Sequence, residues 1–334
     1  MGVDVDEAGC HHHPCRVDLG GRIVVDGPDS DDSPILDAHI AFESRRTRAV
    51  DDRAVAENEI EHCFAPSVSR EITLQGMRPP RNVRLDMAYR GTDFHGFAEN
   101  EGVATIGGTL RGALERILRE EVELVVAGRT DAGVHAAHQV VSFRTTSERF
   151  DPQRLATSLT RLCAPDIVVR SAQEVDDDFD ARFSAAARSY EYTVNDGPHP
   201  DPLRAGTEWW VGETLDLDAM NAAASGFEGE HDFGSFCRRP KDRPDASLTR
   251  RVSRATWQRA DPARVVFAIE ANAFCHQMVR SLTGFCVEVG RGRRQADEVG
   301  EVLAASDRGV AGPVAPPSGL VLVDVTYTAR GDSA

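Results

Sequence analysis

The sequence contains almost no lysine and few aromatic residues. Of its 38 basic residues only one is lysine, and aromatic side chains make up 6% of the 334 residues. Acidic residues number 54, which leaves a formal net charge of −16. Such an excess of carboxylates with so little lysine is typical of proteins adapted to high salt or encoded by GC-rich genomes. It describes solvation rather than fold.

Long apolar runs are missing as well. No stretch approaches the roughly 20 apolar residues that a membrane-spanning helix needs. The first residues are acidic and lack the apolar core of a secretion signal. The seven cysteines are odd in number and scattered, without a Cys-x-x-Cys pair. They indicate reduced thiols in the cytoplasm rather than a disulfide framework.

Residues 1–76 differ in character from the rest. By count they hold 16 acidic and 7 basic residues, so −9 of the net charge of −16 lies there and −7 in the remainder. They lack sustained periodicity, which is typical of disordered chain. We expect a dispensable or untranslated extension, with Met77 as the true start; an intact mass that begins near Gly2 would refute this. Residues 10–15, CHHHPC, offer metal ligands, but neighbouring side chains rarely converge on one ion, so adventitious binding is the preferred interpretation.

From Arg81 onward, strand and helix patterns follow one another. Apolar residues two apart predict strands, and spacings of three and four predict helices. The predicted strands are 83–87, 122–128, 139–143, 166–172, 189–194, 251–258, 264–271 and 320–327, and the predicted helices are 110–118, 155–162, 217–224, 274–289 and 295–305. Because regular strand–helix–strand spacing is missing, we expect an α+β fold with antiparallel sheet.

The segment GRTDAGVHA, residues 128–136, follows a predicted apolar strand. Gly128 and Gly133 allow tight turns, so Asp131 is expected to project from a loop at a sheet edge. Arg129, two residues before it, would favour the ionised carboxylate. That suits a nucleophile or an electrostatic stabiliser and does not suit a general acid. Taken alone, the segment is better explained by an Asx turn or a helix cap.

Other segments favour a functional role for Asp131 over an Asx turn or a helix cap. They are LDMAYRGTDFHGF (85–97), FDARFSAAARSYEYTV (179–194), GEHDFGSFCR (229–238), ANAFCHQMVRSLTG (271–284) and APPSGLVLVDVTY (315–327). Together with GRTDAGVHA, which is similar to a catalytic-aspartate signature, they resemble the tRNA pseudouridine synthase A family from about Arg81 to the C-terminus. The family's usual Gly-Trp-Gln is replaced by Gly96-Phe97-Ala98, so that contact is expected to differ. With the charge, the resemblance suggests a member from a halophilic archaeon.

The resemblance implies an isomerase that converts uridine to pseudouridine in the anticodon stem-loop of tRNA, at positions 38–40, without cofactor or catalytic metal. Asp131 is the implied nucleophile, and it either attacks the ribose or triggers elimination. The target base must be unstacked before an enzyme can reach it. Arg129 is implied to assist this flipping, and Tyr190 to stack on the uracil and hydrogen-bond to it. Arg280 is implied to pair with Asp131.

The residue pattern by itself supports the implied role of Arg280 more than that of Tyr190. Phe274, Met278 and Leu282 trace an apolar stripe on a predicted helix, and Arg280 falls among these core-facing positions. A partly buried arginine requires a carboxylate partner, for which Asp131 is the candidate. Without the resemblance, Tyr190 would be interpreted as an ordinary aromatic residue of the core.

The resemblance further implies two similar α/β halves, 77–180 and 181–334. Their antiparallel sheets join into one extended sheet with helices on one face, and the cleft between the halves carries Asp131. It implies a cytoplasmic homodimer in which one tRNA contacts both subunits, away from any membrane. Arginine-rich segments at 238–254 and 290–294, with Arg81, Arg84 and Arg90, predict a phosphate-binding stripe, although such runs usually mark a solvated face.

Two alternatives belong to other classes. A catalytically silent RNA-binding module of the same fold has no need of the complete set of Asp131, Arg129, Tyr190 and Arg280. An aspartic protease needs two carboxylates that share a proton. No second Asp-x-Gly with an apolar lead-in is present, and Asp196-Gly197 is followed by proline.

Overall fold

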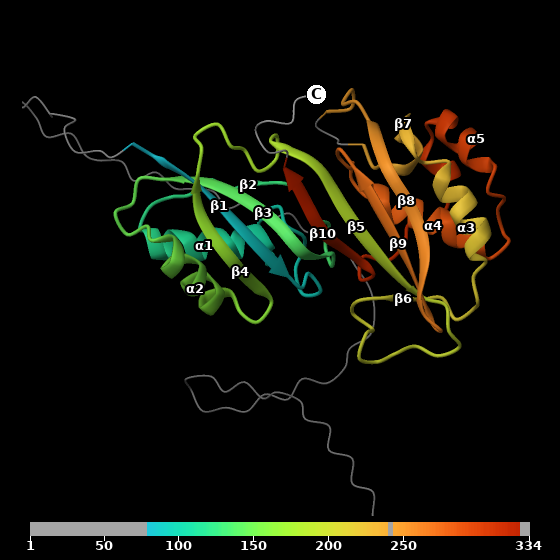
Figure 1. Cartoon of the computed structure of the whole chain (residues 1–334), viewed down its shortest axis with the longest axis horizontal. Helices are drawn as coiled ribbons and strands as arrows, with labels where there is room; N and C mark the ends of the chain where they lie inside the picture. Colours follow the sequence, from blue (N-terminus) through green and yellow to red (C-terminus); the bar gives the residue numbers. More distant parts are fainter. Residues whose placement is uncertain (1–78, 240–242, 328–334) are drawn as a thin grey trace, which may run out of the picture. The chain divides into compact units, whose positions relative to one another are not determined.

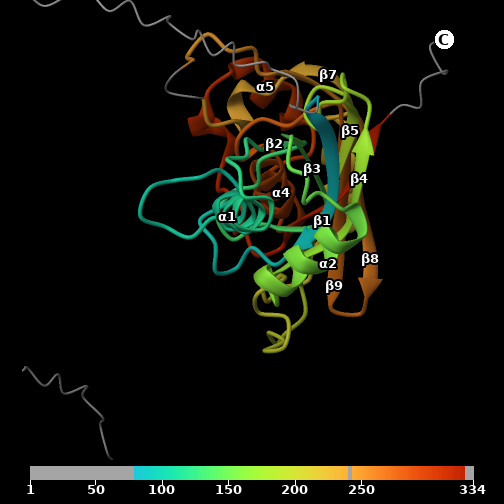
Figure 2. The ribbon, with the colours of Figure 1, turned by 90° about the vertical axis from the view of Figure 1, so that its left-hand side faces the viewer.

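In the described part of the chain, ten strands form one sheet and five α-helices cover one of its faces (Figure 1, Figure 2). This computed structural model describes residues 79–327, apart from 240–242. They belong to the second of two compact units into which the chain divides, Ile72–Ala334. The expectations for residues 1–76, including Met77 and the CHHHPC segment, fall outside the described residues.

The predicted α+β class is confirmed by the order of elements. The strands are β1 (Arg81–Tyr89), β2 (Val125–Val126), β3 (His135–Thr145), β4 (Ile167–Val175), β5 (Ala185–Asn195), β6 (Trp209–Trp210), β7 (Gly229–Asp232), β8 (Thr249–Asp261), β9 (Arg264–Ala271) and β10 (Leu320–Tyr327). The helices are α1 (Ile106–Leu118), α2 (Pro152–Cys163), α3 (Leu217–Ser225), α4 (Met278–Gly290) and α5 (Glu298–Ala305), with 3-10 turns η1 (Gly234–Phe236) and η2 (Arg308–Ala311). None of these helices is both long and apolar enough to cross a membrane.

The last strand joins the two groups of strands. The sheet runs in the order β4-β1-β3-β10-β5-β9-β8-β7. Neighbours on this path are antiparallel except β3 and β10, which are parallel, with Val321 opposite His135. As a result, the residues just before β10 lie beside those just before β3, which include the GRTDAGVHA loop.

Alternating side chains bury the helix-covered face of the sheet. Along β9, Val265, Phe267 and Ile269 are almost fully buried while their neighbours are half-exposed. Trp257 of β8 stacks on Phe267 with ring centroids 4.9 Å apart. Burying each such large apolar side chain contributes about 1.5–3 kcal/mol. The core therefore follows the period-two pattern that the sequence displays.

Two predicted boundaries are wrong for local reasons. The helix predicted from residue 274 begins only at Met278, because Gln277 adopts a left-handed conformation with φ of 65°. Phe274 therefore lies in a loop rather than on a helical stripe. The strand predicted at 122–128 shrinks to β2, because the Val122 amide bonds to the Glu115 carboxylate of α1 instead of to a strand.

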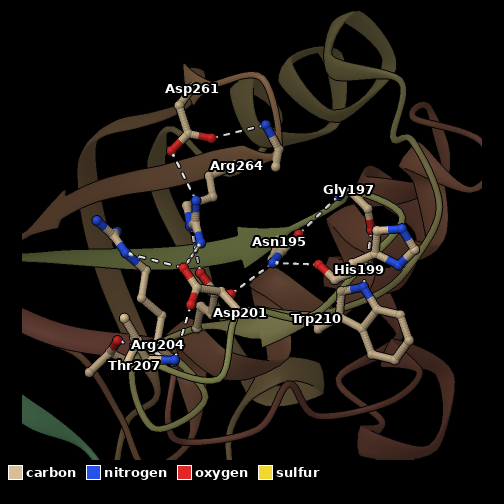
Figure 3. A network of polar contacts seen from close by, with 12 residues as sticks. Asn195, Gly197, His199, Asp201, Arg204, Thr207, Trp210, Asp261 and Arg264 are labelled. Atoms are coloured by element: carbon tan, nitrogen blue, oxygen red, sulfur yellow. Dashed lines mark hydrogen bonds and ion pairs between the residues drawn. The ribbon is translucent and has the colours of Figure 1, made fainter.

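A polar network holds the loop between β5 and β6 (Figure 3). Arg264 donates to Asp201 and to Glu208 at 2.8 and 2.6 Å, and Asn195 donates to Glu208 at 2.8 Å. The carbonyl of Gly206 in this loop lies 2.9 Å from His135 Nε2 at the start of β3. The network thus supports the strand that directly follows the GRTDAGVHA loop.

Candidate active site

The GRTDAGVHA loop is fixed by side chains from β1 and β3. Gln139 Nε2 donates to the Gly128 carbonyl at 2.7 Å. The Tyr89 hydroxyl lies 2.8 Å from Thr130 Oγ1, and the Phe97 amide donates to the Thr130 carbonyl at 3.0 Å. Phe97 is buried and its ring centroid lies 6.2 Å from that of Tyr89. The residue that departs from the family pattern thus packs beneath this loop.

The two glycines of the loop differ in why the position is occupied by glycine. Gly133 has φ of +79°, and an added Cβ would lie 2.9 Å from Pro317 Cγ, so both conformation and space require glycine there. Gly128 has no positive φ, and an added Cβ would lie 3.6 Å from the Tyr190 hydroxyl. The expectation of a tight turn therefore applies to Gly133, whereas Gly128 lies next to the Tyr190 hydroxyl.

The Asp131 side chain is turned toward α4. Arg280 Nη1 donates to Oδ2 at 3.0 Å, and His276 Nε2 lies 3.4 Å from Oδ1. The carboxylate is 21% exposed, so solvent or a substrate can reach it. Among the described residues its oxygens cap neither a turn nor a helix, and no second carboxylate bonds to it. The Asx-turn and aspartic-protease interpretations therefore gain no support.

Arg280 is fixed from two directions. Its Nε donates to the Ala315 carbonyl at 2.8 Å, and the Ala315 amide donates to the Arg280 carbonyl at 3.0 Å. The arginine side chain is only 14% exposed. Arg129, by contrast, is exposed and forms no ion pair with any residue described here. Arg129 was expected beside Asp131, but among the described residues the arginine that pairs with Asp131 is Arg280.

Tyr190 lies in β5 with its ring almost fully buried. Its ring meets Phe274 edge-on, with centroids 5.1 Å apart. Burial raises the pKa of the Tyr190 phenol, and the nearby Tyr89 and Asp131 raise it further. The hydroxyl therefore remains protonated at neutral pH and can donate a hydrogen bond.

The sequence analysis missed two polar residues near Tyr190 and Asp131, namely Arg188 and His276. Arg188 of β5 is buried and donates to four carbonyl groups, those of Ala127, Arg182, Ala185 and Asn272. Burial lowers its pKa. The signal was available, because Arg188 lies two residues before Tyr190 on the same strand face. His276 was detectable only from its four-residue spacing to Arg280.

Part of the predicted phosphate-binding stripe is engaged in ion pairs. Arg291 lies 2.5 Å from Glu213, Arg293 lies 3.3 Å from Glu288, and Arg294 lies 3.0 Å from Glu298. Arg84 pairs with Asp86, and Arg90 pairs with Asp166 and Asp93. These arginines already have carboxylate partners, so they offer little charge to a phosphate. Segment 290–294 is better described as a solvated, ion-paired face.

The cysteines depart from expectation at one place. Cys237 and Cys275 are joined in a disulfide, with Cα atoms 5.8 Å apart, although all thiols were expected to be reduced. The fold explains the proximity, because the Arg238 amide donates to the His276 carbonyl at 2.9 Å and aligns the two segments. Cys163 and Cys286 are free and buried. Within the described residues, no three His, Cys, Asp or Glu side chains cluster as a metal site.

Comparisons with known proteins agree on one family. The sequence profile described as tRNA pseudouridine synthase matches residues 87–184 and 223–328. The tRNA pseudouridine synthase A of Corynebacterium glutamicum is 41% identical over 260 residues, covering 73% of this chain and 89% of that protein. The protein of the same name from Streptomyces griseus is 42% identical over 254 residues, covering 74% and 88%. In Myxococcus xanthus the identity is 40% over 246 residues, covering 73% and 91%.

Proposed function

Because the chain belongs to the tRNA pseudouridine synthase family, it is an isomerase that converts uridine to pseudouridine in tRNA, and we propose that it acts in the anticodon stem-loop with Asp131 as nucleophile. The observation that carries the assignment of Asp131 is its contact with Arg280. Arg280 Nη1 holds Oδ2 at 3.0 Å, whereas Oδ1 has only His276 nearby, at 3.4 Å, beyond an ordinary hydrogen bond. Oδ1 is therefore the oxygen available for reaction.

Two chemical routes fit a carboxylate in this position. In the first, Oδ1 attacks C1′ of the ribose, the C1′–N1 bond breaks and the uracil leaves as an anion. In the second, Asp131 removes the proton on C2′, and the same bond breaks by elimination. In both, the uracil turns and C5 bonds to C1′. Asp131 is released, either from its bond to C1′ or by returning the proton to C2′, and C5 then loses its own proton while N1 gains one. Arg280 places a positive charge beside the carboxylate, which is the nucleophile in one route and the base in the other.

The base must leave the RNA stack before Asp131 can reach the ribose. We assign this step to Arg129, which is exposed on the same loop and has no described ion-pair partner. Tyr190 is assigned to the flipped uracil, since its hydroxyl lies next to Gly128 of the Asp131 loop and, being protonated, can donate to a carbonyl oxygen. Burial limits how much of the ring is accessible, so contact is expected at the hydroxyl end.

Several finer points belong to the proposal. The described sheet is consistent with halves at 77–180 and 181–334, preceded by an extension at 1–76. The homodimer in which both subunits contact one tRNA, the cytoplasmic location and the choice of positions 38–40 stay predictions. Origin in a halophilic archaeon also stays a prediction, supported by the charge of −16 alone, since the relatives reported above are bacterial.

The test is pseudouridine mapping on an unmodified tRNA transcript with the wild-type chain and with Asp131→Ala, in molar and in low potassium chloride. We expect new pseudouridine in the anticodon stem-loop with the wild type only. Product elsewhere in the tRNA would remove the stem-loop assignment. A wild-type chain that binds tRNA without forming product in either salt would instead indicate the silent RNA-binding module.

A further inference from the structure

A hollow of about 670 Å³ next to the first turn of α4 is lined by arginines. Arg238, Arg239 and Arg308 line it, and within the described residues none of the three has a carboxylate at ion-pair distance. Asp307 also lines it, but its Oδ1 accepts from the Gly309 amide at 2.8 Å. Three cations against one carboxylate leave this arginine hollow with net positive charge.

Arg308 is the most informative of the three. Its Nη2 donates to Ser281 Oγ at 2.9 Å, and no other acceptor for this guanidinium is found among the described residues. Burial lowers its pKa, because no carboxylate compensates the lost hydration. A guanidinium has five N–H donors. An anion in the arginine hollow would satisfy donors that the chain itself leaves without partners.

This arrangement differs from that of segment 290–294. Arginines of segment 290–294, at the other end of α4, are each paired with glutamate. The chain has carboxylates in excess, with 54 acidic residues against 38 basic ones. An arginine cluster without carboxylate partners in such a chain points to a ligand that carries the negative charge.

The arginine hollow borders the proposed reaction site. The Arg238 amide donates to the His276 carbonyl at 2.9 Å, and the His276 side chain lies 3.4 Å from Asp131. Ser281, which binds Arg308, directly follows Arg280 in the sequence. The hollow and the Asp131 carboxylate therefore both contact the start of α4, so one RNA strand could reach both.

We propose that the arginine hollow binds a phosphodiester of the substrate RNA, from a nucleotide adjacent to the uridine that is isomerised. This inference rests on the proposed function, since it takes RNA as the substrate. Guanidinium groups bind phosphate oxygens through paired hydrogen bonds. Holding the neighbouring backbone would keep the strand in place while the target base is extruded.

The test compares RNA affinity across salt concentrations in full-length chains that also carry Asp131→Ala, which prevents turnover. The probe is a synthetic anticodon stem-loop, and the variants are Arg238→Gln, Arg308→Gln and the conservative Arg238→Lys. Arg154→Gln is the matched control, because Arg154 is an exposed arginine of α2 outside the proposed site. We expect about tenfold weaker binding for each glutamine variant of the hollow, as for a lost hydrogen bond to a charged group. The slope of log K against log salt should become shallower by roughly 0.7.

A second arm identifies the ligand. A neutral methylphosphonate placed at the contacted phosphate should weaken binding as Arg308→Gln does, and combining the two changes should add little. Arg238→Lys should retain most of the salt slope, which a merely misfolded variant would not. Unchanged slopes in both glutamine variants would overturn the proposal. Two results together would also overturn the proposal: additive losses at whichever phosphate the methylphosphonate replaces, and a higher melting temperature of the chain in inorganic phosphate. That combination would indicate a site for free phosphate.

The outcome is separable from that of the proposed function. Chains with the natural Asp131 are assayed for pseudouridine in parallel. Product from the wild type with unchanged salt slopes in the hollow variants would reject only the arginine hollow. Altered slopes without any product from the wild type would reject only the proposed reaction. A wild-type chain that fails to bind the RNA would reject both.

Discussion

Arg280 Nη1 lies 3.0 Å from Asp131 Oδ2, across 149 positions of sequence. The same guanidinium donates through Nε to the Ala315 carbonyl at 2.8 Å. One side chain thus positions the carboxylate and ties α4 to the segment that leads into β10. Because β10 is the strand that joins the two groups of strands, the geometry of this carboxylate depends on how the whole sheet is assembled.

Replacing Arg280 separates its charge from its geometry. Arg280→Gln should lower the single-turnover rate of pseudouridine formation by roughly 10²- to 10³-fold, as for loss of one preorganised electrostatic group. Arg280→Lys should recover part of that loss, because an ammonium supplies charge but not two fixed donor directions. Thermal unfolding measured alongside shows whether each variant is folded. Equal rates for the glutamine variant and the wild type would mean that Asp131 does not depend on this contact.

The sequence predicts this pair only in part. An arginine at position 280 among apolar neighbours signals a buried partner, and a carboxylate after an apolar strand signals a loop at a sheet edge. Neither pattern joins the two, since periodicity describes single elements and the contact is between elements. The pairing of Asp131 with Arg280 came from family resemblance rather than from spacing.

What the sequence could not predict was decided by tertiary contacts. Gln277 begins α4 in a left-handed conformation, which no propensity favours in glutamine, and this removes Phe274 from the helix and places it against Tyr190. The Cys237–Cys275 pair is separated by 38 residues, so spacing alone says nothing of its proximity. The pairing of Arg291 and Arg293 with Glu213 likewise joins positions that are remote in sequence.

Tyr190 contributes a ring and a hydroxyl, and two substitutions separate them. Tyr190→Phe should lower the single-turnover rate about 10²-fold through the lost hydrogen bond, while RNA affinity changes little. Tyr190→Leu should lower the rate to a similar extent, because it removes the same hydroxyl. Tyr190→Leu should also destabilise the fold by about 0.5–1.5 kcal/mol, because the edge-on contact with Phe274 is lost. An unchanged rate for Tyr190→Phe would exclude a role for the hydroxyl.

The disulfide makes a prediction that chemical labelling can check directly. If the chain is unfolded in denaturant with a maleimide and no reductant, Cys163 and Cys286 should be labelled, whereas Cys237 and Cys275 should require reduction first. A loop of 38 residues implies that Cys237→Ser lowers the free energy of unfolding by about 3–4 kcal/mol in the chain-entropy model. Cys163→Ala is the control, since it removes a free buried thiol. Labelling of Cys237 and Cys275 without reductant would restore the interpretation of reduced cytoplasmic thiols.

His135 gives the stability of the fold a pH dependence of definite sign. Burial lowers the pKa of its imidazole below the ordinary value of 6.5, and Arg90 lowers it further, although hydrogen bonds to the Gly206 and Ser318 backbone oppose this. The unfolded chain therefore binds the proton at a higher pH than the folded chain does. The contribution of His135 is fully present above pH 6.5 and is lost as the pH falls through the folded value.

His135→Gln should remove that dependence, since glutamine retains hydrogen-bonding groups without titrating in this range. Urea unfolding is measured for both chains from pH 8 down to about 5, the range over which an imidazole normally gains its proton. The wild type should lose free energy of unfolding more steeply below pH 6.5 than the variant does. His199→Gln is the matched control, because that side chain is exposed and should leave the wild-type slope unchanged. Parallel curves for the wild type and His135→Gln would show that this histidine titrates alike in both states. The loop from 196 to 208, which rests on His135 through Gly206, would then not depend on a neutral imidazole.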